Sequence, residues 1–225
     1  MKKYEVRGWI EETGVIAAVR VYSADDALFA AETVAGHGIP VVEITLTVPR
    51  ATEVISHLVK NTPHIVVGAG GVTNATVARQ CLDAGAQFFT SDGGLHPRLI
   101  EFAVKEDVVV FPGALTPTEV INAWEEGVDF VKVVPCAQIG DETYIGSLHR
   151  MFPNIPLIAS GGINQQNASK FILAGALALG VGRELIPTEA IRLRQADRIG
   201  ELARRFLSFV KSGRDHLAAR KKNGH

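Results

Sequence analysis

The chain has 225 residues, of which 47% are hydrophobic and 21% are charged, and it contains 22 glycines. This composition excludes a disordered or fibrous chain, and the length allows one α/β barrel or two small domains. Lysine and arginine total 23 against 24 aspartates and glutamates, a net charge of −1. No broad positive field therefore attracts nucleic acid or an anionic membrane, and any anion site must be local.

Cysteine content and hydropathy predict a soluble protein of the cytoplasm. Cys81 and Cys136 are too few and too far apart for a disulfide framework or a paired-cysteine metal site, and they fit a reducing compartment. The first dozen residues carry both charge signs and lack the apolar stretch of a secretory signal. The longest apolar run, 171–182, is shorter than the roughly 18 residues of a membrane-spanning helix.

The predicted elements are eight repeats of a strand followed by a helix, preceded by a short amphipathic segment at 4–12. Val/Ile-rich runs predict strands at 15–21, 40–46, 64–70, 87–91, 108–113, 129–135, 156–160 and 176–182. The runs start about 20–27 residues apart, which suits one strand, one helix of about three turns and two short loops.

Polar residues and glycines mark the predicted ends of the helices. Short polar side chains that can cap a helix N-terminus stand at Ser23, Thr73, Thr116 and Asn164. Glycines that can end a helix in the left-handed conformation stand just before the next strand, at Gly38, Gly85, Gly127 and Gly175.

Near-continuous hydrophobic strands alternating with helices predict a parallel sheet covered by helices. Eight units favour closure into a (β/α)8 barrel, a TIM barrel, because right-handed crossovers bring the eighth strand beside the first. An open doubly wound sheet is the alternative. We expect one domain over 1–225, in which an N-terminal helix within 1–14 caps the barrel bottom and 212–225 form a frayed basic tail without a role.

Three predicted strands carry an ionisable residue inside an apolar run: Arg20, Glu43 and Lys132. Each one alone is more simply read as an outward-facing residue that forms a salt bridge. In a barrel, however, all three converge on the mouth formed by the C-terminal strand ends, where buried charges must pair or serve a substrate.

The chemistry of these three residues suggests a 2-oxo acid. A desolvated lysine near a second cation has a lowered pKa, so Lys132 is expected to be partly neutral amine that attacks a ketone and forms a Schiff base. Glu43 then moves protons, and Arg20 clamps the substrate carboxylate.

Glycine loops after the seventh and eighth predicted strands suggest a phosphate site. Ser160, Gly161 and Gly162 follow the seventh strand, and Gly182 and Arg183 follow the eighth. Either glycine group alone can be a tight turn. Together they occupy the two loops that usually cradle phosphate in this barrel, because glycine lets backbone N–H groups approach the oxygens.

With these residues placed, the sequence resembles the 2-dehydro-3-deoxy-phosphogluconate (KDPG) and 4-hydroxy-2-oxoglutarate (KHG) aldolases from about residue 15 to residue 187. The resemblance rests on ordered motifs: AAVR at 17–20, VEITLTVP at 42–49, VGAG at 67–70, AGAQF at 84–88, PG at 112–113, TPTE at 116–119, VKVVP at 131–135, SGGI at 160–163 and GVG at 180–182.

The resemblance implies a Schiff base on Lys132, with Glu43 as acid and base. It implies reversible cleavage of a 2-keto-3-deoxy-6-phospho sugar acid to pyruvate and glyceraldehyde 3-phosphate, with 4-hydroxy-2-oxoglutarate as a second substrate. It implies no metal, no cofactor and a homotrimer. The implied substrate-binding residues are Arg20, Thr47, Gly70, Gly71, Asp92, Pro135, Ser160, Gly161, Gly162, Gly182 and Arg183.

Several positions depart from the family's pattern. Thr47 stands where one branch has arginine, although Arg20 matches the arginine that another branch supplies from the first strand. Gly71 replaces a threonine, Asp92 a proline and Val134 an aromatic residue. Ser160 conservatively replaces a threonine, and Arg183 replaces a serine. These changes predict an altered substrate tail or weaker activity.

Two other functions remain open at this point. One is a divergent barrel that acts on a different 2-oxo acid, or that binds a small anion with little turnover. The other, a sugar-phosphate isomerase or epimerase on the same fold, needs a different acid/base pair or metal ligands.

Overall fold

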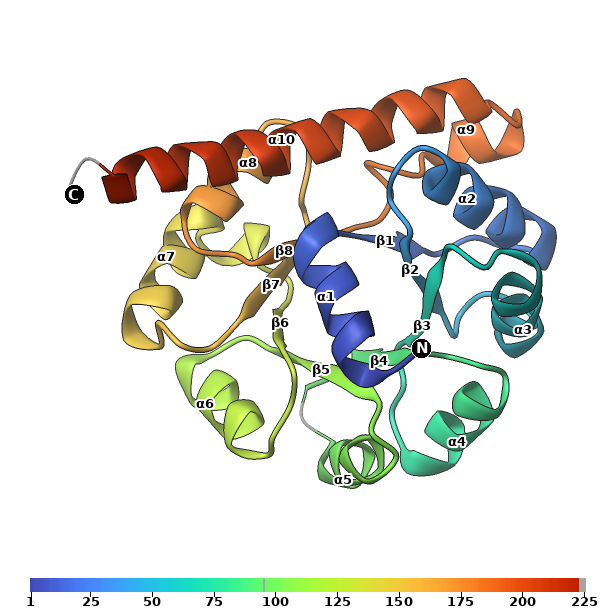
Figure 1. Cartoon of the computed structure of the whole chain (residues 1–225), viewed down its shortest axis with the longest axis horizontal. Coiled ribbons are helices and arrows are strands. Elements are labelled where there is room, and N and C mark those ends of the chain that lie inside the picture. Colours follow the sequence, from blue (N-terminus) through green and yellow to red (C-terminus); the bar gives the residue numbers. More distant parts are fainter. Residues whose placement is uncertain (95, 223–225) are drawn as a thin grey trace.

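The computed structural model describes residues 1–94 and 96–222, and its eight parallel strands close into a barrel (Figure 1). Closure comes from pairing of the first and last strands, for example Ala17 with Val181. The (β/α)8 prediction is therefore confirmed, and the open sheet is wrong. The strands are β1 Val15–Val19, β2 Val41–Thr45, β3 Val66–Gly70, β4 Phe88–Ser91, β5 Val109–Ala114, β6 Val131–Val133, β7 Leu157–Ser160 and β8 Ala178–Val181.

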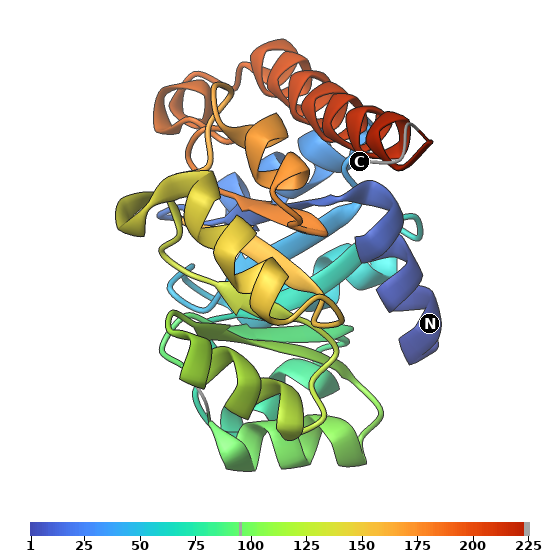
Figure 2. The same ribbon diagram turned by 90° about the vertical axis from the view of Figure 1, so that its left-hand side faces the viewer.

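Helices alternate with the strands and cover the outside of the barrel (Figures 1 and 2). They are α1 Lys3–Thr13, α2 Ala24–Gly36, α3 Ala51–Asn61, α4 Ala75–Asp83, α5 Pro97–Lys105, α6 Pro117–Glu125, the short 3-10 helix η1 Ala137–Ile139, α7 Asp141–Met151, α8 Ala168–Leu173, α9 Thr188–Arg192 and α10 Ala196–Lys222. Within the described ranges, none of these helices is long and apolar enough to cross a membrane.

The predicted helix signals are confirmed at some ends and wrong at others. Ser23 accepts a hydrogen bond from Asp26 N, and Thr116 forms a reciprocal capping box with Glu119. Asn74, not Thr73, caps α4, and Asn164 lies in a turn three residues before Asn167, the N-cap residue of α8. The predicted stop glycines all have positive φ: Gly38, Gly85, Gly127 and Gly175.

Helix α1 lies across the N-terminal end of the barrel, as expected for the segment before the first strand (Figure 1). Val6 and Ile10 of α1 pack on a buried cluster that fills the lower barrel. Three rings form its centre: Phe88 stacks on Phe111 at 5.4 Å, and Phe111 meets Phe130 edge-on at 5.8 Å. The bottom of the barrel is therefore closed by apolar packing.

Two predicted boundaries differ from the structure. All eight strands are present with ends that differ by no more than two residues, but β1 ends at Val19, so Arg20 is the first residue beyond it. The expected tail over 212–225 is wrong for 212–222, because α10 continues to Lys222 and packs on α8 and α2. Residues 223–225 lie outside the described residues.

Candidate active site

The C-terminal strand ends surround a cavity of about 680 Å³. It is lined by most of the substrate and catalytic residues expected from the sequence: Arg20, Glu43, Thr47, Asp92, Lys132, Ser160, Gly161, Gly162, Gly182 and Arg183. Gly70, Gly71 and Pro135 do not line it. The structure therefore brings together charged groups from five strands or strand ends, those of β1, β2, β4, β6 and β8, that are far apart in the sequence.

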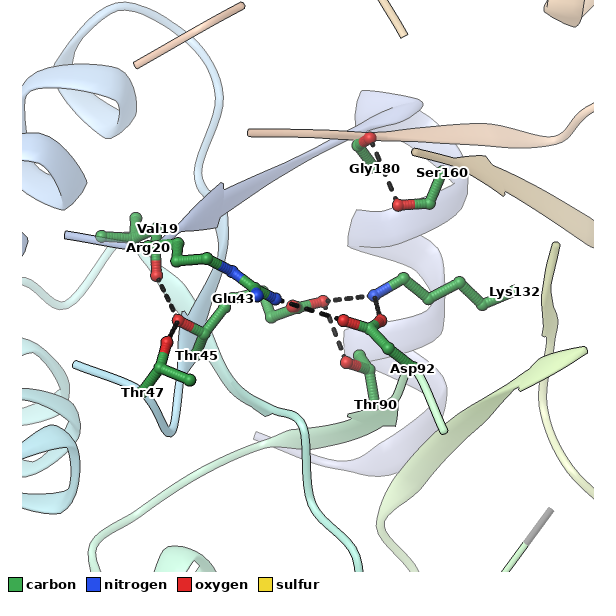
Figure 3. Close-up of polar contacts among 10 residues, drawn as sticks. All are labelled: Val19, Arg20, Glu43, Thr45, Thr47, Thr90, Asp92, Lys132, Ser160 and Gly180. Carbon is green, nitrogen blue, oxygen red and sulfur yellow. Dashed lines mark hydrogen bonds and ion pairs between the residues drawn. The ribbon is translucent and has the colours of Figure 1, made fainter. Parts of the chain in front are cut away.

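Lys132 occupies the middle of β6 and points into the barrel one layer above the aromatic cluster, because Phe130 two residues earlier faces the same side. Its side chain is only 4% exposed. The Nζ atom lies 2.7 Å from Asp92 Oδ1 and 3.3 Å from Glu43 Oε2 (Figure 3). The amine is thus held between two carboxylates at the inner end of the cavity.

The surroundings of Lys132 correct the expected charge state of this lysine. Burial by itself lowers its pKa, but the charges of Glu43 and Asp92 outweigh burial and raise the pKa above the usual lysine value. The second cation, Arg20, contacts the other oxygen of Asp92 rather than Lys132. The raised pKa favours the ammonium form of Lys132, from which a proton must leave before the amine can attack a ketone.

Glu43 is fixed inside the barrel on β2, with its side chain 3% exposed. Thr90 on β4 donates to Glu43 Oε2 at 3.0 Å. Gly70 on β3 makes room for the carboxylate, because a Cβ at this position would lie 2.2 Å from Glu43 Oε1. Gly70 thus acts by its lack of a side chain rather than by touching the cavity.

Asp92 follows β4 and joins the two cations of the site. Its Oδ2 accepts from Arg20 at 3.2 Å, while its Oδ1 accepts from Lys132. Although burial raises the pKa of Asp92, the nearby charges of Lys132 and Arg20 lower it below the usual value. Two cations and two carboxylates therefore form one continuous network (Figure 3).

The loops after β6, β7 and β8 form the other wall of the cavity. Gly161 and Gly162 both adopt positive φ, and a Cβ on Gly161 would lie 2.8 Å from Pro135 Cα. Pro135 therefore supports the loop after β7 from behind. Arg183 and Gly182 come from the loop after β8, and the Arg183 side chain is exposed at the cavity.

Three further predicted residues, Thr47, Ser160 and Gly71, lie beside the network of charged side chains rather than within it. Thr47 lines the cavity, and its hydroxyl lies 2.9 Å from that of Thr45, which donates to Val19 O. The Ser160 hydroxyl contacts Gly180 O at 3.5 Å. Gly71 has positive φ, and nothing lies within 4 Å of where its Cβ would be.

Sequence reasoning missed several contributors to this site, among them Thr90, Tyr22 and Gln138. Thr90 could have been noticed as a hydroxyl near the end of an apolar strand, on the face that points into the barrel. Tyr22, which is 87% exposed, and Gln138 also line the cavity. Tyr22 lies in the loop after β1 and Gln138 in the short helix η1 after β6, and no pattern in the sequence separates a lining residue from a solvent-facing one at either place.

A family model described as KDPG and KHG aldolase matches residues 6–202 of this chain. The 2-dehydro-3-deoxy-phosphogluconate aldolase of Treponema pallidum (strain Nichols) is 26% identical over 201 residues, which cover 89% of this chain and 95% of that protein. The KHG/KDPG aldolase of Escherichia coli (strain K12) is 28% identical over 198 residues, covering 88% and 92%.

Among solved structures, a similar one is KDPG aldolase from Legionella pneumophila with pyruvate captured at low pH as a covalent carbinolamine intermediate. It has a TM-score of 0.81 and 27% identity, and the match covers 88% of this chain and 96% of that chain.

Proposed function

Since the chain belongs to the KDPG and KHG aldolase family, we propose that it is a class I aldolase, an aldehyde-lyase that forms a Schiff base between Lys132 and a 2-oxo acid. One observation carries the choice of residues: the buried Lys132 amine has the Glu43 carboxylate 3.3 Å away inside a cavity that opens to solvent. A nucleophile with an adjacent proton acceptor is the arrangement that covalent catalysis requires.

The first half of the reaction makes the covalent intermediate. Lys132 loses one proton to a neighbouring carboxylate, and its amine attacks C2 of the substrate to give a carbinolamine. Glu43 protonates the departing hydroxyl, water leaves, and the iminium of Lys132 forms. Arg20 holds the substrate carboxylate next to C2.

The second half breaks the C3–C4 bond. A base, Glu43 acting directly or through water, removes the proton of the C4 hydroxyl, and the bond electrons move into the iminium to give an enamine and an aldehyde. Glu43 then returns a proton to C3, and one water hydrolyses the iminium. Pyruvate leaves and Lys132 is regenerated, so the water lost in the first half is recovered.

For the aldehyde half, we propose a phosphorylated three-carbon product, as in the cleavage of 2-dehydro-3-deoxy-6-phosphogluconate to pyruvate and glyceraldehyde 3-phosphate. The loops with Ser160, Gly161, Gly162 and Gly182, together with the Arg183 guanidinium, support an anion at the far end of the cavity. The name of the E. coli relative supports 4-hydroxy-2-oxoglutarate as a second substrate, which yields glyoxylate.

The working form that we propose is a homotrimer in the cytoplasm. The trimer rests on the family to which the chain belongs, and two buried cysteine thiols, Cys81 and Cys136, suit a reducing compartment. Sedimentation equilibrium of the purified protein tests the trimer.

Borohydride reduction in the presence of pyruvate tests the mechanism. Intact-mass analysis should detect one covalent pyruvate adduct on the wild type and none on Lys132→Ala, because hydride reduces the iminium to a stable secondary amine. The Lys60→Ala variant, which removes an exposed lysine on α3 outside the cavity, is the control and should retain the adduct. Absence of the wild-type adduct, or its persistence in Lys132→Ala, would overturn the assignment.

A further inference from the structure

The Asp92 carboxylate binds both of the residues, Arg20 and Lys132, that a 2-oxo acid substrate would need to contact. The proposed function requires Arg20 for the substrate carboxylate and Lys132 for the adjacent ketone carbon. In the structure Asp92 accepts from Arg20 through Oδ2 at 3.2 Å and from Lys132 through Oδ1 at 2.7 Å (Figure 3). The Asp92 side chain therefore stands between the same two groups as the carboxylate and carbonyl of the substrate would.

The fold brings Asp92 into this place from the end of β4. Gly113 on β5 leaves room beneath it, since a Cβ there would lie 2.7 Å from Ser91 O and 3.1 Å from the carbonyl carbon of Asp92. The Ser91 hydroxyl donates to Gly94 O, which ties the loop back on itself. The Asp92 side chain is nevertheless 40% exposed, whereas Lys132 and Glu43 are 4% and 3% exposed. Asp92 is thus the carboxylate of the network that can move toward solvent.

We propose that Asp92 is a specificity-determining residue that competes with the substrate carboxylate for Arg20 and thereby weakens the preference of the site for a 2-oxo acid over a neutral ketone. This inference rests on the proposed function, because it assumes that Arg20 and Lys132 receive the carboxylate and the ketone. It assigns to Asp92 a role in choosing the donor ketone, distinct from the proton transfers of Glu43.

The proton balance of the displacement follows from the contacts. When the substrate carboxylate takes Arg20, Asp92 loses one of the two cations that favour its ionised form and becomes a better proton acceptor. The Lys132 ammonium then passes its proton to Asp92 across the 2.7 Å contact, and the exposed carboxyl releases that proton to water. When the amine attacks, its nitrogen gives a second proton to Glu43 while water returns one to the carbinolamine oxygen, so Glu43 holds the proton that the departing hydroxyl needs. The amine of Lys132 is left free to attack C2.

The other charged groups at the cavity do not duplicate these contacts. Glu43 faces Lys132 from β2 and is held by Thr90. Arg183 and Glu184 line the cavity from the loop after β8, and His96 lies beside Gly93, the neighbour of Asp92.

A neutral ketone offers no carboxylate to Arg20, so it gains no contact with Arg20 when Asp92 is displaced. The wild type should therefore be less selective for pyruvate over a neutral ketone than a protein without the competing carboxylate.

The test compares pyruvate with acetone in borohydride trapping of Asp92→Asn, with intact mass as the readout. The half-saturating pyruvate concentration should fall about tenfold, the scale of one charge-assisted hydrogen bond, and the ratio of pyruvate to acetone trapping efficiency should rise by about as much. The ratio separates competition at Arg20 from a general gain in amine reactivity, because free amine favours both ketones equally.

Two further variants complete the design. Glu53→Gln removes one negative charge from an exposed pair with Arg50, neither of which lines the cavity, and should leave the trapping of both ketones unchanged. Asp92→Ser is a second neutral replacement and should raise the ratio as Asn does, so the test does not depend on one variant folding.

Failure of this inference can be distinguished from failure of the proposed function. A wild-type adduct combined with an unchanged or lower pyruvate-to-acetone ratio in both Asp92 variants overturns this inference alone, and it identifies Asp92 as a residue that positions Arg20. Failure to trap pyruvate in the wild type and in both variants overturns the proposed function, and this inference with it.

Discussion

At the scale of single residues, the ammonium of Lys132 lies within hydrogen-bonding distance of two carboxylates, at 2.7 and 3.3 Å. Only Glu43 of the two is shut inside the barrel, where Thr90 and the space left by Gly70 fix its orientation. A fixed carboxylate can exchange protons with the same substrate atoms in every turnover, whereas the exposed Asp92 can leave. The two acidic residues therefore suit different tasks in one site.

A prediction at this scale concerns Arg183 at the far end of the cavity. Arg183→Ala should reduce kcat/KM for the phosphorylated sugar acid about tenfold or more, the loss of a charge-assisted contact, and should spare 4-hydroxy-2-oxoglutarate. A coupled assay of pyruvate release measures both substrates on one preparation. Arg192→Ala, which disrupts an exposed pair with Glu189 on α9, is the control. Equal losses on the two substrates would show that Arg183 does not read phosphate.

At the scale of elements, helix α1 is fastened to the strands that it covers by one buried carboxylate. Asp129, just before β6, is 5% exposed and pairs with Lys3 at 3.0 Å and Arg7 at 3.8 Å. Its Oδ2 also accepts from the backbone N of Val110 on β5. Asp129 thus joins α1 to the same strands whose opposite ends carry the site.

Replacing Asp129 by Asn should loosen this junction. We expect Asp129→Asn to lower the free energy of unfolding by about 2 kcal/mol, because the ion pairs of a buried carboxylate with two cations are lost while the shape is kept. Urea denaturation measures the change. Glu11→Gln removes the exposed partner of the same Arg7, and this control should cost well under about 1 kcal/mol. A similar cost for both variants would mean that Asp129 is no more important than a surface charge.

At the scale of the whole molecule, the C-terminal part of the chain contacts the N-terminal part in two places. Strand β8 pairs with β1, and α10 returns along the outside to pack on α8 and α2, the helices next to that seam (Figure 2). Arg214 of α10 donates to Glu12 O at 2.7 Å, Glu11 O at 2.6 Å and Leu177 O at 3.3 Å. These carbonyls belong to the end of α1 and the start of the last repeat, so one guanidinium connects both ends of the chain.

Arg214→Ala should therefore destabilise the closed barrel. It leaves three carbonyls without their donor, including those at the negative end of the α1 dipole, and we expect a loss of about 2–3 kcal/mol. Thermal and urea unfolding measure it. Arg220→Ala removes an exposed arginine from the same helix and should change stability by less than about 0.5 kcal/mol. If the two variants unfold alike, the Arg214 contacts do not hold the seam.

The sequence alone determined the architecture, and it singled out Lys132 and Glu43, which the structure places 3.3 Å apart. Strand periodicity, glycines at helix ends and the number of repeats identified the barrel, because these are local signals repeated eight times. Glu43 and Lys132 stood out because charges are costly in apolar strands. The sequence did not locate two helix starts, because Thr73 and Asn164 are as good caps as the residues that hold the N-cap positions, Asn74 of α4 and Asn167 of α8.

The tertiary structure decided how the charges are paired. The sequence suggested a cation beside Lys132 and hence a partly neutral amine, whereas the fold put Asp92 between Arg20 and Lys132 and raised the pKa of the lysine. Arg20 and Lys132 are 112 positions apart in the sequence. The distance from each of them to Asp92 depends on the tilt of the strands and on the path of the chain after β4. Electrostatic interactions depend on separation in space, so a list of charged residues in the sequence does not fix the charge state of any of them.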